Sequence, residues 1–132
     1  MHPCKILIID DDKDDVEILS DAFIKNGIEE VHYVDSAHKA IEYLNQIEKE
    51  EDLPKLIVTD LYLPAKNGLE LISDLGQTAP YNKIPVVLLS TLRYEMVQDM
   101  NKEISFSDYI KKPNSYDEYL QVARFLQQRI VA

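Results

Sequence analysis

The sequence lacks several features that would place a chain in a membrane or outside the cell. It has one cysteine, Cys4, so it cannot form an internal disulfide, and a reducing compartment is the default. Its apolar runs reach only about five residues, whereas a membrane-spanning helix needs roughly 20. Residues 1–5 lead straight into such a run, which leaves no space for a signal peptide. We therefore expect a cytoplasmic protein without a membrane segment.

Positive charge is also scarce. The chain has 14 lysines and arginines against 24 aspartates and glutamates, a net charge of −10, so most of its surface would repel a phosphate backbone. We expect no nucleic-acid partner. The 132 residues are 45% hydrophobic and 29% charged, as in a folded domain of ordinary size. With no repeat, linker or low-complexity stretch, residues 1–132 are expected to form a single domain with no output domain.

Two kinds of apolar pattern alternate along the chain. Short continuous apolar runs predict strands buried on both faces, at residues 6–9, 31–34, 55–59, 84–89 and 108–111. Between them, apolar residues recur at helical spacing. Helices are predicted to end at Asn26-Gly27, to begin at Ser36, and to cover residues 68–75 and 94–101. The last helix starts with a capping box of Ser115 and Glu118.

This alternation of five strands and five helices predicts an α/β fold with a parallel sheet covered on both faces. Because crossovers between parallel strands are right-handed, a doubly wound arrangement is expected. Ligands in such folds bind outside the carboxyl ends of the strands, where the strand order reverses. The residues that follow each strand are therefore the candidates for a functional site.

Acidic, hydroxyl and ammonium groups follow the predicted strands. They are Asp10, Asp11 and Asp12 after the first, Asp60 after the third, Ser90 and Thr91 after the fourth, and Lys111, Lys112 and Pro113 after the fifth. Taken alone, the acidic run of residues 10–15 also fits helix capping and solvation. The combination indicates more, because converging carboxylates repel one another and a hard cation such as Mg²⁺ relieves that repulsion. One carboxylate can then attack phosphorus while a lysine and a hydroxyl stabilise the phosphoryl oxygens.

Four segments resemble the CheY-like receiver domain of bacterial two-component response regulators. They are ILIIDDD at residues 6–12, VTDLYLP at 58–64 followed by Gly68, IPVVLLS at 84–90, and YIKKP at 109–113. The segments occur in the family's order and spacing over essentially the whole chain. The resemblance implies a flavodoxin-like sheet of five parallel strands in the order 2-1-3-4-5, and a single-domain signalling switch rather than an enzyme.

The resemblance also implies the chemistry of the site. Asp60 matches the phosphoacceptor. Asp10 and Asp11 match the acid pair that, with Asp60 and the backbone carbonyl of Tyr62, holds Mg²⁺ or Mn²⁺. Lys112 matches the lysine that contacts the phosphoryl group. Asp12 has no such role and is expected to be a cap or loop residue.

Further positions are implied to transmit and time the signal. Ser90 matches the hydroxyl that contacts the phosphoryl group and moves with it, with its neighbour Thr91 as the rival for that role. Tyr109 matches the aromatic switch residue. Tyr62 and Leu92 flank the path by which water reaches the phosphoryl group. Both are bulky and neither can orient water, so slow self-hydrolysis is expected.

The implied partners are proteins. A sensor histidine kinase or a histidine phosphotransfer protein would donate the phosphoryl group, and an unknown downstream protein would read the fourth helix, fifth strand and fifth helix. The same surface is a candidate for a homodimer. Its candidate contact residues, each of which can equally be core, are Tyr94, Met96, Met100, Phe106, Tyr116 and Tyr119.

Two other functional classes, an enzyme acting on phosphate esters and an interaction module without phosphorylation, fit the sequence less well. A haloacid-dehalogenase-type phosphatase carries a second aspartate two residues after its nucleophile, and Tyr62 occupies that position here. A P-loop nucleotidase is excluded because the chain has no G-x-x-x-x-G-K-[ST] segment. A pseudo-receiver that only binds partners typically lacks part of the acidic set, which this chain keeps.

Overall fold

The computed structural model describes residues 4–92, 94–100 and 108–130. Five parallel strands form one sheet in the order β2-β1-β3-β4-β5, as the sequence resemblance implied. The strands are β1 (Ile6–Ile9), β2 (Val31–Val34), β3 (Leu56–Asp60), β4 (Val86–Ser90) and β5 (Asp108–Lys111). The helices are α1 (Lys13–Lys25), α2 (Ala37–Asn45), α3 (Gly68–Gly76), α4 (Tyr94–Met100) and α5 (Tyr116–Ile130), with short 3₁₀ turns at Glu50–Asp52 and Tyr81–Lys83.

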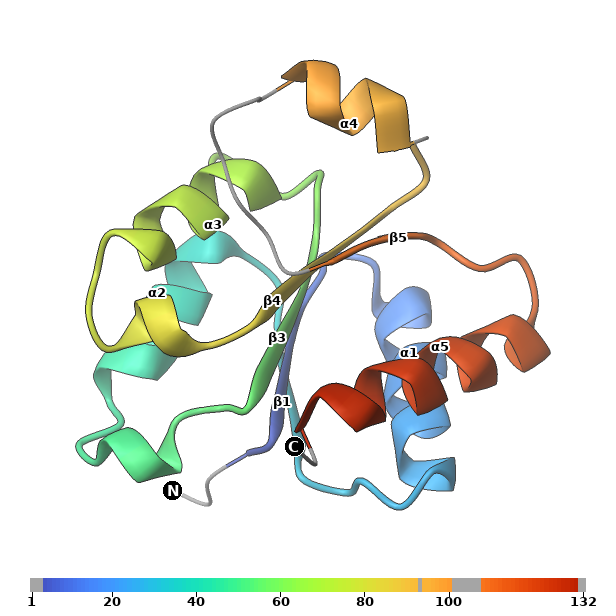
Figure 1. Ribbon diagram of the computed structural model, residues 1–132, viewed down its shortest axis with the longest axis horizontal. Helices are drawn as coiled ribbons and strands as arrows, with labels where there is room; N and C mark the ends of the chain where they lie inside the picture. Colours follow the sequence, from blue (N-terminus) through green and yellow to red (C-terminus); the bar gives the residue numbers. More distant parts are fainter. Residues whose placement is uncertain (1–3, 93, 101–107, 131–132) are drawn as a thin grey trace.

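Helices cover both faces of the sheet (Figure 1). α1 and α5 pack against each other on one face, while α2 and α3 lie on the other. The strands supply both layers, because successive side chains point to opposite faces. In β1, Leu7 and Ile9 join the layer under α2 and α3, and Ile6 and Ile8 join the layer under α1 and α5. This two-sided burial is the reason the strands read as continuous apolar runs.

The helix ends carry the predicted caps, except that only the serine half of the Ser115–Glu118 capping box is formed. The Asp12 side chain accepts from the Asp14 and Asp15 N–H groups at the start of α1, which confirms Asp12 as a cap. Gly27 follows the end of α1 with a φ of 91°, a conformation that glycine adopts without strain. Before α5, the Ser115 hydroxyl accepts from the Glu118 N–H, whereas the Glu118 carboxylate reaches the N–H of Asn114.

Strand boundaries differ from the predicted ones by one or two residues. β3 runs one residue further and includes Asp60, and β4 starts at Val86 rather than residue 84. Pairing decides these ends: Asp60 pairs with Leu89, and Ile57 pairs with Val86. Asp60 is therefore held by the sheet ladder. Within the described ranges, no helix combines the length and the apolar character needed to cross a membrane.

Candidate functional site

Three carboxylates meet at the carboxyl ends of β1 and β3. Asp10 and Asp11 follow β1, Asp60 ends β3, and these two strands are neighbours in the sheet. One oxygen from each residue lies within 4.8 Å of the others. Asp10 and Asp60 are buried, whereas Asp11 is exposed. Oxygen ligands at this spacing, one of them facing solvent, fit a hard divalent cation that keeps part of its water shell.

Burial controls the electrostatics of Asp60. Burial first, and the neighbouring charge of Asp10 second, raise the pKa of the Asp60 carboxyl to about 6. Lys112 and the Leu61 N–H, which donates to Oδ1 over 2.8 Å, act in the opposite direction. Burial likewise raises the pKa of Asp10, against the 2.9 Å hydrogen bond that its Oδ1 accepts from the Asp12 N–H. Both buried carboxyls are therefore harder to ionise than exposed ones, chiefly because burial disfavours the charged form.

Lys112 brings the ammonium group into this cluster. The backbone N–H of Lys112 donates to the Ser90 carbonyl over 2.7 Å. This bond extends the β4–β5 pairing by one residue and directs the Lys112 side chain into the site. Nζ lies 3.1 Å from Asp10 Oδ2 and 3.6 Å from Asp60 Oδ2. Burial disfavours its charge, but the carboxylates outweigh burial and raise the pKa of Lys112. The neighbouring Lys111 is exposed, as expected for adjacent positions on a strand.

Gly68 lets the start of α3 approach the backbone of Asp60. A Cβ at this position would lie 2.2 Å from the Asp60 carbonyl oxygen, which no side chain can occupy. The Gly68 N–H also donates to the Leu61 carbonyl over 2.8 Å. Asn67 caps the helix through a capping box with Glu70. The loop from Asp60 to α3 is therefore closed tightly behind the site.

Ser90 and Thr91 differ sharply in placement. Ser90 ends β4 and is fully buried, whereas Thr91 is exposed. The Ser90 hydroxyl accepts from the Leu92 N–H over 3.2 Å, so it closes the turn after β4. This placement favours Ser90 over Thr91 as the hydroxyl that belongs to the site.

Tyr109 and Ser90 are linked through the Ser90 backbone. The half-buried Tyr109 ring packs on the hydrophobic layer under α2 and α3, and its hydroxyl lies 3.5 Å from the Ser90 carbonyl oxygen. Burial raises the pKa of this phenol. Because Lys112 donates to the same carbonyl, one peptide group connects the lysine, the serine and the tyrosine.

The remaining expected positions fall into two groups. Tyr62 is 56% exposed and Leu92 is half-buried, so the side chains expected to flank water access differ in exposure. On the expected partner surface, Met96 and Tyr116 are exposed, whereas Tyr119 is part of the core. Phe106 and the side chains of Tyr94 and Met100 lie outside the described residues.

Asp15 is a site residue that the sequence reasoning missed. Its Oδ2 lies 2.7 Å from Lys112 Nζ, nearer than either Asp10 or Asp60. The acidic run of residues 10–15 fitted capping, and Asp12 does cap α1. Spacing could not have identified Asp15, because Asp11 precedes the cap of α1 and only Asp14 and Asp15 of this acidic run lie in its first turn.

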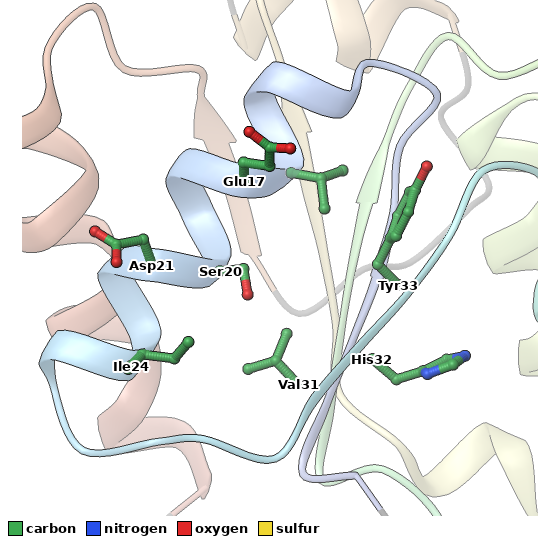
Figure 2. A pocket seen from close by; sticks show the side chains of 8 residues that line it. Glu17, Ser20, Asp21, Ile24, Val31, His32 and Tyr33 are labelled. Atoms are coloured by element: carbon green, nitrogen blue, oxygen red, sulfur yellow. The ribbon is translucent and has the colours of Figure 1, made fainter.

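A separate hollow of about 460 Å³ lies between α1 and β2 (Figure 2). Glu17, Ser20, Asp21 and Ile24 line it from α1, and β2 supplies the other wall. The side chains of Glu17, Ser20 and Asp21 point in different directions (Figure 2). Asp21 already accepts a hydrogen bond from the Tyr116 hydroxyl.

Comparison with known proteins identifies the class. The model of the response regulator receiver domain matches residues 6–124, and the chain belongs to this family of two-component signalling proteins. An uncharacterized 14.6 kDa protein of Leptolyngbya boryana is 31% identical over 127 residues, which cover 96% of this chain and 90% of that protein. The transcriptional regulatory protein CpxR of Escherichia coli K12 is 26% identical over 95% of this chain, but the match spans only half of CpxR.

Solved structures give the same result. The phosphorylated cyanobacterial phytochrome response regulator RcpA has a TM-score of 0.83 and 26% identity, covering 98% of this chain and 94% of RcpA. The Mn²⁺-bound response regulator Rcp1 has a TM-score of 0.77 and 25% identity, covering 93% of this chain and 91% of Rcp1. The family binds Mg²⁺ or Mn²⁺ at an acidic pocket, which corresponds to the Asp10, Asp11 and Asp60 cluster.

Proposed function

We propose that the chain is a phosphorylation-dependent switch in which Asp60 accepts the phosphoryl group. The observation that carries this proposal is the convergence of Asp60 with Asp10, Asp11 and Lys112 at one end of the sheet. The donor would be a sensor histidine kinase or a histidine phosphotransfer protein. A carboxylate oxygen of Asp60 attacks the phosphorus, the bond from phosphorus to the donor imidazole nitrogen breaks, and that nitrogen leaves with the electron pair.

The other residues of the site hold and neutralise the transferred group. Asp10, Asp11, Asp60 and the backbone carbonyl of Tyr62 would hold Mg²⁺ or Mn²⁺, which supplies positive charge to the phosphoryl oxygens. Lys112 lies close enough to Asp60 to reach a phosphoryl oxygen with little movement. Ser90 supplies a buried hydroxyl that can donate a hydrogen bond to the same group.

The readout is proposed to run from Ser90 to Tyr109 and then to the surface of α4, β5 and α5. As the Ser90 hydroxyl moves toward the phosphoryl group, the Tyr109 ring changes position. Exposed Met96 and Tyr116 support a downstream protein contact on this surface, and a homodimer would use the same surface. In this proposal residues 1–132 act as a single cytoplasmic receiver unit whose output is protein binding, without nucleic acid or membrane.

The test is phosphorylation by acetyl phosphate with and without Mg²⁺, followed by mass spectrometry that maps the modified residue. The wild type is expected to gain one phosphoryl group on Asp60, and Asp60→Asn to gain none. Asp14→Asn is the matched control, because it removes the same charge from an exposed position in the first turn of α1. Asp11→Asn is expected to lose the metal dependence. Equal labelling of the wild type and Asp60→Asn would refute the assignment.

A further inference from the structure

Asp15 is the nearest carboxylate partner of Lys112 among the described residues. Nζ lies 2.7 Å from Asp15 Oδ2, 3.1 Å from Asp10 Oδ2 and 3.6 Å from Asp60 Oδ2. The first two distances are those of charge-assisted hydrogen bonds, and the third is too long for one. The ammonium group is therefore drawn toward α1 and away from the acceptor.

The backbone holds both ends of this ion pair. The Asp15 N–H donates to the cap residue Asp12, which fixes the first turn of α1. The Lys112 N–H donates to the Ser90 carbonyl, which fixes the backbone after β5. The Lys112 side chain is 10% exposed and that of Asp15 is 26% exposed, so solvent screens this pair less than a surface salt bridge. The contact joins residues 97 positions apart in the chain.

We propose that Asp15 is a positioning residue that competes with the phosphoryl group for Lys112. This inference rests on the proposed function of Asp60. An ammonium has three N–H donors, and Asp15 and Asp10 already occupy two of them. A phosphoryl group on Asp60 adds negative charge next to Asp60 Oδ2, which lies 3.6 Å from Nζ, and a small shift of the ammonium group toward this charge weakens its pair with Asp15. Asp15 therefore favours the unmodified state and sets a threshold for activation.

The competing explanation is that Asp15 only fastens α1 to the loop after β5. Removing a purely structural tie would lower the stability of the protein without changing its preference for a phosphoryl group. Competition makes a different prediction: the loss of Asp15 should increase that preference. Affinity for a phosphoryl mimic separates the two explanations, because it compares two states of the same folded protein.

The experiment measures binding of beryllofluoride, a phosphoryl mimic, in saturating Mg²⁺ by NMR titration. Wild type, Asp15→Asn, Asp14→Asn and Asp60→Asn are compared. Asp14→Asn removes an equal charge one residue away. Asp14 is exposed, and the carboxylates within 4.0 Å of Lys112 Nζ among the described residues are those of Asp10, Asp15 and Asp60. We expect Asp15→Asn to bind about fivefold more tightly than wild type and Asp14→Asn. Asp15→Ser serves as a second variant if Asp15→Asn folds poorly.

The ¹⁵N shift of Lys112 Nζ provides an independent readout. In free Asp15→Asn it should move toward the value of the beryllofluoride-bound wild type, and in Asp14→Asn it should stay at the wild-type value. If the wild type binds beryllofluoride but both Asp15 variants bind it no more tightly than the wild type, the proposed competition is overturned and the proposed role of Asp60 is not. Absence of binding by wild type would overturn the proposed role of Asp60 and this inference with it.

Discussion

Replacing Asp60 with asparagine should stabilise the metal-free protein at neutral pH. In the folded state the pKa of this carboxyl is raised from an ordinary 3.8 to about 6, chiefly by burial. A difference of that size corresponds to about 3 kcal/mol of unfavourable free energy for the ionised form in the fold. Asparagine has nearly the same shape, and its side-chain oxygen can still accept from the Leu61 N–H. Because its amide group must also find partners, we expect a net gain of about 1–3 kcal/mol.

The pH dependence distinguishes this cause from a general packing effect. Between about pH 4 and pH 6 the folded protein retains a proton on Asp60 that the unfolded chain has already lost, so the contribution of Asp60 to stability falls as the pH rises. Above that window the destabilisation is complete. The difference in unfolding free energy between Asp60→Asn and wild type should therefore be smallest below about pH 4, rise between pH 4 and pH 6, and reach its full value above pH 7.

The assay is urea unfolding followed by circular dichroism in EDTA at several pH values. With a urea dependence of about 1–3 kcal/mol per molar, a gain of about 2 kcal/mol moves the midpoint by roughly 1 M. Asp14→Asn controls for loss of an exposed acid from a highly acidic chain. A difference that does not change with pH, or an Asp60→Asn protein less stable than Asp14→Asn at pH 7.5, would refute the electrostatic reasoning.

Three further perturbations test the metal site, the loop behind it and the access path. Mg²⁺ should raise the melting temperature of the wild type much more than that of Asp11→Asn, since a ligand that binds only the folded state stabilises it. Equal shifts of both proteins in differential scanning fluorimetry would contradict a metal site at Asp11. Gly68→Ala should lower the free energy of unfolding by at least about 2 kcal/mol, because the alanine Cβ would lie 2.2 Å from the Asp60 carbonyl oxygen. An unchanged urea midpoint would contradict this close approach. The double variant Tyr62→Asn, Leu92→Glu should lose its phosphoryl group about tenfold faster than the wild type, which corresponds to a hydrolysis barrier lower by roughly 1.4 kcal/mol. Decay at the wild-type rate would show that access of water at these two positions does not limit hydrolysis.

Most of the fold could be predicted because burial on both faces leaves a strong pattern in the sequence. Residues Ile6–Ile9 are all buried, as a continuous apolar run predicts for a central parallel strand. Strand ends were less predictable. Asp60 is polar and looks like the first residue after β3, but its pairing with Leu89 places it in the ladder. Such pairing is a property of two distant segments and leaves little trace in either one.

The candidate site was predictable where it depends on strand ends. Asp10, Asp11 and Asp60 come together because β1 and β3 are adjacent, and this follows from the strand order. Asp15 was not predictable in the same way. Its role depends on where the Lys112 side chain ends, and an acidic first helical turn is common for reasons of capping and dipole alone. Helical position also separated exposed Tyr116 from buried Tyr119, which composition cannot distinguish.

The contacts of Lys112 suggest how a local charge change reaches the fifth strand. Its side chain responds to the carboxylates, while its backbone N–H is bonded to the Ser90 carbonyl that also lies near the Tyr109 hydroxyl. In the proposed mechanism, a phosphoryl group on Asp60 would draw the Lys112 ammonium from Asp15. It would also draw the Ser90 hydroxyl from its hydrogen bond with the Leu92 N–H, so both changes would act on the Ser90 backbone. Tyr109 is half-buried and packs at the edge of the hydrophobic layer under α2 and α3. In the proposed mechanism, Asp60 and the expected partner surface would therefore be coupled through Ser90 and the turn after β4.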